Sequence, residues 1–301
     1  MTPAGTYACR TVDQEVWVRT RAAVAGGVVL ILVAVIAIWL VARRVGDELR
    51  LPLAGRTCTV QADGRVVLDV EQMANAATIA AIGVQRGMPE RAVVVALATA
   101  YQESGLRNLD HGDRDSLGLF QQRPSKGWGT PAEIRDPRYA ANRFYKALKK
   151  VRGWEKMRVT DAAQRVQRSA FPEAYQKWAD DSEVLTKALL GDATEAVACT
   201  VGRTPVMRGA AAAAQLTRNL ALDWGVSSAE KTSQTGLAVT AQDQRDGWRY
   251  AHWLVSHAQD HGVKRVRFGD LEWTARNGTW GQVTGEQGSA GQVVAEVFAE
   301  G

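Results

Sequence analysis

The sequence contains no run rich in lysine or arginine and none of the cysteine and histidine spacings of a zinc finger. These absences argue against nucleic acid as a partner. The net charge of +5 and the pI of about 9.2 fit an anionic neighbour, such as a membrane surface or a wall polymer, without identifying one. Because basic residues are dispersed among acidic ones, a solvated surface of mixed charge is the simpler explanation.

Charge is also absent from one long segment, residues 22–42 (AAVAGGVVLILVAVIAIWLVA). As a helix, these 21 residues would span about 30 Å, the thickness of a hydrocarbon core. No small-residue cleavage site follows, which argues against a removable signal peptide. The segment therefore predicts a single transmembrane anchor, although arginines on both flanks leave its orientation open.

Cysteine is scarce, with Cys9 before the apolar segment and Cys58 and Cys199 after it. Two cysteines that bracket one block of chain suggest a disulfide, which persists in an oxidising compartment. Closing a loop of about 140 residues contributes about 4–5 kcal/mol on the chain-entropy account. We predict a Cys58–Cys199 disulfide with Cα atoms about 4.4–6.8 Å apart, the alternative being two unrelated buried thiols. The disulfide places the N-terminus inside the cell and the bulk of the chain on the extracytoplasmic side of the cell membrane.

A chain of 301 residues has room for two ordinary domains, and its composition is that of a folded protein. The predicted fold is a mostly α domain after a single transmembrane helix, followed by a small α+β domain. The expected segments are a cytoplasmic part (1–21), the anchor (22–42), a tether (43–57), the mostly α domain (58–199) and the α+β domain (200–301).

The stretch 96–124 (ALATAYQESGLRNLDHGDRDSLGLFQQRP) is the part of the sequence that indicates chemistry. Glu103 and Ser104 end a predicted apolar helix that Gly105 terminates. A carboxylate there faces the negative end of the helix dipole, which raises its pKa, as does burial beside a cleft. A general acid that protonates a glycosidic oxygen near neutral pH needs this protonated form. On spacing alone, a solvated surface glutamate is the commoner explanation.

Glu103-Ser104, followed by Gly-Leu-Phe-Gln at 118–121 and then a proline, resembles the motif pair of soluble lytic transglycosylases and goose-type lysozymes in the lysozyme-like superfamily. The Gly-Asp-Arg at 112–114 is similar to a run in goose-type lysozymes. Weaker likenesses are Ala-Ala-Asn at 140–142 and Ala-Tyr at 174–175. The block between Cys58 and Cys199, about half the chain, resembles a lysozyme-like variant of actinobacterial and phage-related wall proteins.

The resemblance implies a role for each matching residue. Glu103 matches the catalytic acid, and Tyr175 matches the tyrosine that holds its carboxyl in place. Gln121 matches a residue that lines the sugar site, while Ser104 would orient Glu103 or secure the helix end. Asp113 matches the first of two aspartates that hold water in goose-type lysozymes.

Three aromatic residues, Trp128, Tyr139 and Phe144, are further candidates for stacking on sugar faces. Ordinary core packing explains each of them equally well. On these residues alone the choice between sugar binding and packing stays open.

Departures from the family pattern bear on the mechanism: Phe120 stands for methionine, Gln176 for asparagine and Arg123 for the second aspartate. Inverting hydrolysis needs a base about 6.5–9.5 Å from the acid, and Asp113 and Asp115 are the nearby candidates. A lytic transglycosylase needs no second carboxylate, because the 6-hydroxyl of the substrate attacks to form a 1,6-anhydro sugar. We therefore predict a lytic transglycosylase, with a hydrolytic muramidase as the alternative.

A non-catalytic wall-binding scaffold is a further alternative, which the retained Glu103 and Gln121 disfavour. The expected partners are peptidoglycan, the cytoplasmic membrane through one transmembrane helix, and an envelope-spanning machinery as a further candidate. No cofactor is expected. His257 and His261 have a spacing that can chelate a metal, but no third ligand accompanies them, so no metal is predicted and a solvated helix end is preferred.

Overall fold

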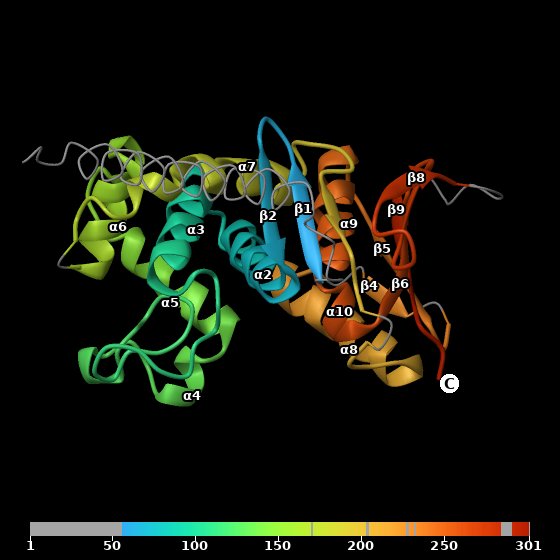
Figure 1. Cartoon of the computed structure of the whole chain (residues 1–301), viewed down its shortest axis with the longest axis horizontal. Coiled ribbons are helices and arrows are strands. Elements are labelled where there is room, and N and C mark those ends of the chain that lie inside the picture. The colour runs from blue at the N-terminus through green and yellow to red at the C-terminus, as the bar shows by residue number, and fades with distance from the viewer. Residues whose placement is uncertain are drawn as a thin grey trace, which may run out of the picture. The chain divides into compact units, whose positions relative to one another are not determined.

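The computed structural model describes residues 56–169, 171–202, 205–226, 229–231, 233–283 and 291–300. Helices and antiparallel strands both occur in this part of the chain (Figure 1). The α-helices are α2 (Val70–Gln85), α3 (Glu90–Ser104), α4 (Pro131–Ile134), α5 (Pro137–Leu148), α6 (Val159–Gln167), α7 (Ala179–Leu189), α8 (Gly209–Trp224), α9 (Gln244–Ser256) and α10 (Ala258–His261). The strands are β1 (Thr57–Gln61), β2 (Arg65–Asp69), β3 (Val197–Cys199), β4 (Ala229–Lys231), β5 (Gly236–Thr240), β6 (Val263–Phe268), β7 (Leu271–Thr274), β8 (Trp280–Gln282) and β9 (Gln292–Val297). Short 3-10 helices are η1 (Pro124–Lys126), η2 (Trp154–Lys156) and η3 (Gln176–Trp178).

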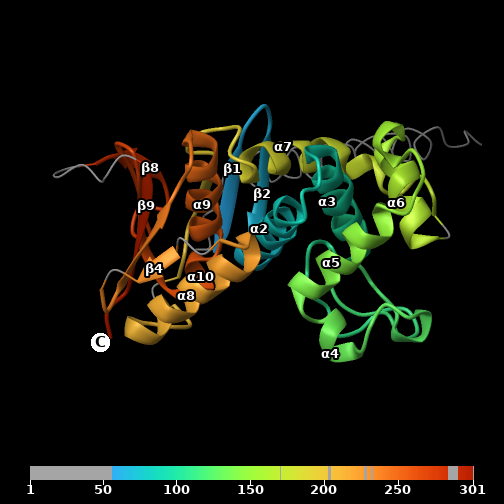
Figure 2. The ribbon, with the colours of Figure 1, turned by 180° about the vertical axis from the view of Figure 1, so that it is seen from behind.

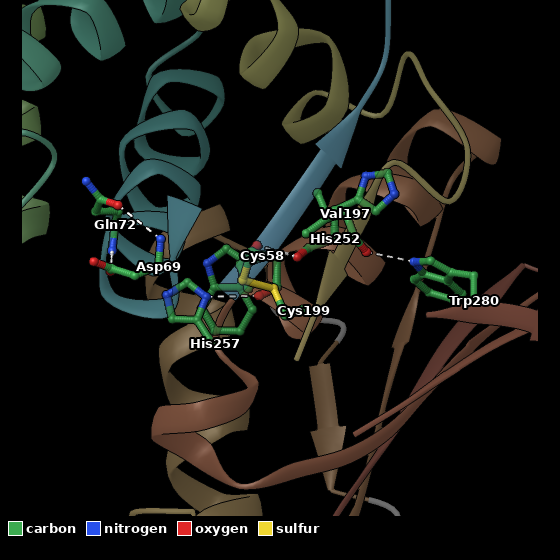
Figure 3. Close-up of a disulfide and its surroundings, with 10 residues drawn as sticks. Cys58, Asp69, Gln72, Val197, Cys199, His252, His257 and Trp280 are labelled. Carbon is green, nitrogen blue, oxygen red and sulfur yellow. Dashed lines mark hydrogen bonds between the residues drawn. A yellow bond between two sulfur atoms is a disulfide. The ribbon is translucent and has the colours of Figure 1, made fainter. Parts of the chain in front are cut away.

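A hairpin of β1 and β2 opens the described chain and leads directly into α2. The two strands pair antiparallel, with Thr59 opposite Val67. The Asp69 side chain then accepts a hydrogen bond from the Gln72 main-chain N–H at 2.9 Å. The Gln72 side chain accepts in return from the Asp69 N–H at 3.0 Å (Figure 3). This capping box satisfies amide groups that a helix start leaves free, and it sets where the helix begins.

The predicted disulfide closes the first sheet, whose strand order is β2-β1-β3. β3 pairs antiparallel with β1, and Cys58 lies directly opposite Cys199 (Figure 3). The two residues are bonded and fully buried, so the predicted pairing is present. Their Cα atoms are 3.9 Å apart, so the predicted distance was too long. Because β3 has only three residues, the sequence pattern did not place it opposite β1.

Helix α2 is enclosed by other helices along most of its length. Every residue from Met73 to Gly83 is buried. α3 and α5 lie on one side of α2, and α8 and α9 lie on the other (Figures 1 and 2). At Gly83, a Cβ atom would be 2.8 Å from the Tyr145 hydroxyl oxygen, which itself donates to the Ile79 carbonyl at 2.9 Å. Glycine at this position therefore allows α5 to approach α2 closely.

The second sheet has six strands in the order β4-β5-β9-β6-β7-β8, and α9 packs against both sheets. His252 on α9 is fully buried, with Nδ1 2.7 Å from the Ala188 carbonyl and Nε2 3.0 Å from the Ala196 N–H. A carbonyl at one nitrogen and an N–H at the other select the neutral ring, and burial lowers the pKa of His252 to about 4. Trp280 of β8 donates from its side chain to the Val197 main-chain carbonyl of β3 at 2.8 Å, so this hydrogen bond links the two sheets (Figure 3).

The predicted fold class, a mostly α domain followed by a small α+β domain, was wrong. The described chain combines helices with two antiparallel sheets, and residues 55–301 form one compact unit. Helices α8 and α9, from the predicted second domain, pack on α2, from the predicted first one. Hydrophobic periodicity locates the faces of a helix that are buried, but it does not identify the segments that cover them.

The prediction of a single-pass membrane protein was also wrong. Within the described ranges, no helix is long and apolar enough to cross a membrane. α2 and α8, with 16 residues each, reach about 24 Å, short of the roughly 30 Å of a hydrocarbon core. The segment 22–42, on which the anchor and the localisation rested, lies outside the described residues.

A buried polar cluster joins α2, α5, α8 and α9. The Asp223 carboxylate has no exposed surface and accepts hydrogen bonds from Thr78 Oγ1 at 3.0 Å and Trp253 Nε1 at 2.8 Å. It also pairs with Arg138 of α5. His257 stacks on Trp253, with ring centroids 4.0 Å apart. Burial raises the pKa of the Asp223 carboxyl, an effect that the Arg138 guanidinium opposes.

Removing the carboxylate should therefore destabilise the whole described unit. We expect Asp223→Ala to lower the free energy of unfolding by about 3–5 kcal/mol, because it leaves a partly buried guanidinium and two buried donors without their acceptor. Urea unfolding followed by circular dichroism measures the change. Glu155→Ala, at an exposed carboxylate on η2, is the control and should stay within about 0.5 kcal/mol of the parent. Equal effects of the two substitutions would contradict a structural role for the cluster.

Candidate active site

Glu103 lies in the last turn of α3, and the helix ends at Gly105 as predicted. Gly105 adopts a left-handed conformation with φ of 62°, and its N–H bonds to the Tyr101 carbonyl at 2.9 Å. Glycine takes this conformation without a steric penalty, so the chain can turn away immediately after Ser104. The Glu103 side chain is left half-buried at the helix end.

Tyr175 meets Glu103 across the fold. The Tyr175 hydroxyl donates a hydrogen bond to Glu103 Oε1 at 2.7 Å, and the tyrosine itself is fully buried. Burial raises the pKa of the Tyr175 phenol above its ordinary value of 10, and the hydrogen bond to the Glu103 carboxylate raises it further. The phenol therefore stays protonated and acts as a donor to one carboxylate oxygen.

A second contact attaches the same segment to α3. Trp178, at the end of η3, donates from Nε1 to the Gln102 side-chain oxygen at 3.0 Å. Its ring also stacks on Tyr101, with centroids 4.7 Å apart and an interplanar angle of 4°. Because Tyr175 and Trp178 are three residues apart on a 3-10 turn, they face the same way and contact consecutive positions of α3.

Ser104 joins the end of α3 to the turn at 118–121. Its hydroxyl oxygen is 2.8 Å from the Leu119 carbonyl and 3.0 Å from the Ala100 carbonyl. Two main-chain hydrogen bonds between Leu117 and Gln122, each 3.0 Å long, close the turn. Gly118 has φ of 72°, and a Cβ atom there would lie 2.7 Å from the Ile134 carbonyl oxygen. The contacts of Ser104 thus secure the turn rather than Glu103.

Gln121 lies at the tight end of this turn, with φ of 46°. Its amide nitrogen is 3.3 Å from the carbonyl oxygens of both His111 and Gly118. Its amide oxygen lies so close to Gly112 that a Cβ atom there would be 1.8 Å away. The half-buried amide is therefore engaged with the 111–118 loop, and glycine at 112 is required for that contact.

The two aspartates of this loop differ in their surroundings. The Asp113 side chain is 89% exposed and lies 3.9 Å from the Arg114 guanidinium. Asp115 instead accepts from the Ser125 N–H at 2.8 Å and from Arg123 Nε at 2.7 Å. The Ser125 N–H, and then the Arg123 guanidinium, lower the pKa of the Asp115 carboxyl well below its ordinary range. A carboxylate stabilised in this way is a weak base.

The three aromatic candidates for sugar stacking differ in how much of their surface is exposed. Phe144 is fully buried and stacks on Phe120 with ring centroids 4.7 Å apart, so it belongs to the core. Tyr139 and Trp128 are half-buried, and the Tyr139 hydroxyl is 3.2 Å from the Trp128 carbonyl oxygen. Of the three, only Tyr139 and Trp128 keep a surface that a sugar can reach.

The distal histidines lie in a different setting from the solvated helix end that was expected. His257 is buried and His261 is half-buried, with ring centroids 6.0 Å apart. Burial lowers the pKa of His257 to about 4 and that of His261 to about 3. Among the described residues, no group of three or more His, Cys, Asp or Glu side chains could hold a metal ion.

The predicted site residues thus divide into two groups. Glu103 meets Tyr175, and Ser104 meets the turn that carries Gln121, whereas Asp113 lies in solvent. Sequence reasoning missed Gln102 and Trp178, although the three-residue spacing of Trp178 from Tyr175 was a usable signal. No protein-family model and no curated protein matches the chain. The function is therefore inferred from the geometry of the site and the resemblance of its motifs.

The geometry of the turn that holds Gln121 predicts that Gly118 cannot be replaced without a loss of stability. Gly118→Ala and Gly127→Ala both place a side chain at positive φ, but only position 118 lacks room for it, since no described atom lies within 4 Å of a Cβ at 127. We expect Gly127→Ala to cost about 1 kcal/mol of unfolding free energy and Gly118→Ala at least about 1–2 kcal/mol more. Chemical denaturation of both variants measures this difference, and equal losses would show that the contact with Ile134 does not constrain the turn.

Proposed function

We propose that this protein cleaves the glycan strands of peptidoglycan at the β-1,4 bond between N-acetylmuramic acid and N-acetylglucosamine. In this proposal it is a lytic transglycosylase, with Glu103 as general acid and then general base. The observation that carries the proposal is the 2.7 Å hydrogen bond from the Tyr175 hydroxyl to Glu103 Oε1. The resemblance pairs these two residues, and they meet although they are 72 positions apart.

The first step is protonation of the leaving group. Tyr175 holds Oε1, so the proton to be delivered resides on Oε2 of the same carboxyl group. Its transfer to the bridging oxygen accompanies cleavage of the bond between that oxygen and C1 of N-acetylmuramic acid. The N-acetylglucosamine side leaves as an alcohol, Glu103 becomes a carboxylate, and positive charge develops at C1 and the ring oxygen.

The second step uses the same carboxylate as a base. Ionised Glu103 takes the proton from the 6-hydroxyl of the muramic acid as that oxygen attacks C1. The new bond closes a 1,6-anhydro ring and the carboxyl group is protonated again, so no water is consumed. A single carboxylate therefore suffices for the complete cycle.

The loop aspartates favour this mechanism over hydrolysis. The low pKa of Asp115 and its bonds to Ser125 and Arg123 make it a poor base for activating water. Asp113 is largely solvated, and within the described ranges no buried side chain orients it as Tyr175 orients Glu103. A hydrolytic muramidase and a non-catalytic wall-binding protein are the alternatives that the experiments must separate.

Glu103→Gln should abolish cleavage while keeping the fold, because the amide has nearly the same shape but no titratable proton. We expect the full-length parent to release 1,6-anhydro fragments from purified peptidoglycan, and the variant to do so about 10²–10⁴-fold more slowly. Mass spectrometry of products formed in heavy-oxygen water is the measurement, with circular dichroism to match the folds.

Each other result selects an alternative. Similar release by both proteins would exclude Glu103 as the catalyst. Heavy oxygen at the new chain ends would identify a muramidase. Tight binding to peptidoglycan by both proteins without any release would identify a scaffold.

Tyr175→Phe tests the positioning of the carboxyl group. Losing one charge-assisted hydrogen bond of about 1.5 kcal/mol should lower kcat about tenfold and leave KM nearly unchanged. Trp178→Phe is the matched control, since it removes the bond to Gln102 on the same segment and preserves the stacking on Tyr101. Equal losses of kcat in the two variants would mean that the segment matters only for packing.

A further inference from the structure

A cavity of about 560 Å³ lies where the turn between α2 and α3 meets the end of α7 and the first turns of α9. Its volume is within the range of small-molecule sites, and its wall combines apolar side chains with charged ones. Glu90, on this wall, opens α3, whereas Glu103 lies in the last turn of the same helix, about 20 Å away. The cavity is therefore separate from the candidate active site, and the cleavage proposed for Glu103 does not require it.

Backbone contacts hold the walls of this cavity in place. In the turn between α2 and α3, the Gly87 N–H donates to the Val84 carbonyl at 2.8 Å. At the end of α7, the backbone approaches α9 so closely that a Cβ atom on Gly191 would lie 2.0 Å from the Arg245 carbonyl oxygen. The cavity is thus largely preformed, which reduces the entropy lost when a ligand enters it.

Two arginines on consecutive turns of α9 form the basic part of the wall. Nε of Arg245 and Nε of Arg249 both donate to the Leu190 carbonyl, at 3.1 and 2.9 Å. One Nη group of Arg245 bonds to Asp192 at 2.6 Å, and one of Arg249 bonds to Asp246, also at 2.6 Å. The other Nη group of each arginine has no hydrogen-bond partner among the residues that the structure describes. Since a guanidinium carries five N–H donors in a fixed fork, each arginine is held in position and can still donate to a ligand.

Glu90 forms the acidic part of the wall. Within the described part of the chain, its carboxylate makes no hydrogen bond and no ion pair. The two arginines already have Asp192 and Asp246 as counter-ions, so the unbalanced charge at the cavity is that of Glu90. A purely anionic ligand would be repelled by this charge. A zwitterion, by contrast, matches a wall that offers free N–H donors on one element and a free carboxylate on another.

We propose that this cavity binds a zwitterionic dipeptide. The carboxylate of the dipeptide accepts hydrogen bonds from the free Nη groups of Arg245 and Arg249, and its ammonium group pairs with Glu90. Its apolar side chains pack on Val84 and Met88, which line the same cavity. Two extended residues span about 7 Å, so both termini of a dipeptide fit within one cavity of this volume.

Calorimetry with the full-length protein and the dipeptide alanyl-leucine tests this site. We expect saturable binding of the dipeptide with both termini free. The N-acetylated dipeptide and the C-terminal amide should each bind about tenfold more weakly, because each loses one charge-assisted contact. Since the two arginines also hold the end of α7, changing the ligand tests their role without disturbing the fold.

Substitutions in the wall locate the bound dipeptide. Glu90→Gln should weaken binding of the free dipeptide about tenfold and leave binding of the acetylated form unchanged, because that form has no ammonium group to pair. Val84→Phe, which fills part of the cavity without changing a charge, should also weaken binding about tenfold or more. Glu155→Gln, the same substitution at an exposed carboxylate on η2, is the matched control and should bind as the parent does. Circular dichroism matches the folds of the variants.

Several results would overturn the dipeptide site, whether or not the parent cleaves peptidoglycan. No binding of alanyl-leucine would do so, as would equal binding of the dipeptide and its amide. Tighter binding of the acetylated form than of the free dipeptide would mean that the cavity takes an anion instead. Unchanged binding by Val84→Phe, or equal losses with Glu90→Gln and Glu155→Gln, would mean that the dipeptide binds elsewhere on the protein.

Discussion

Enclosure of α2 is the constraint on which the other parts of the described structure depend. A helix whose residues from Met73 to Gly83 are all buried has no solvated face, so segments must cover it from every side. The α3 and α5 helices cover one side, and α8 and α9 cover the other. Neither group alone shields the helix from water. The part of the chain after residue 200 is therefore needed to complete the core beneath the candidate site.

This arrangement also determines how the site is supported. α3 packs on α2 and presents Glu103 at its end, while the segment 175–178 contacts that end through Tyr175 and Trp178. The buried Asp223 of α8 pairs with Arg138, the neighbour in sequence of Tyr139. A buried carboxylate is costly unless all of its partners are in place, so this pairing favours one position of α5 over nearby alternatives. The Asp223–Arg138 pair thus helps to fix the position of α5, the helix that carries Tyr139.

Features of the fold that depend on neighbouring residues could be predicted from the sequence, whereas features that depend on contacts between distant segments could not. Gly105 marks the end of α3 through contacts within a few residues, so the end of this helix was predicted correctly. The motif resemblance paired Glu103 with Tyr175 before their contact was known. β3 spans three residues and is defined by its pairing with β1, which no local pattern reveals. The burial of His257 depends on segments distant in sequence, so its spacing from His261 alone suggested a solvated histidine. The pairing of Asp115 with Arg123 depends on loop geometry, so the sequence alone suggested that Asp115 could act as a base.

At position 120, where the sequence departs from the lysozyme-like motif that it resembles, the site is joined through main-chain atoms. Ser104 bonds to the carbonyl of Leu119, and Gln167 donates to the carbonyl of Phe120 at 2.8 Å. Neither contact depends on the side chain at the position that it reaches. Phenylalanine can therefore replace methionine at 120, provided that its ring finds space, and stacking on Phe144 supplies that space. Position 118 has no such freedom, because its left-handed backbone and the nearby Ile134 carbonyl both exclude a side chain. The glycine of this motif is thus fixed by geometry, whereas the residue two positions later is fixed only by volume and hydrophobicity.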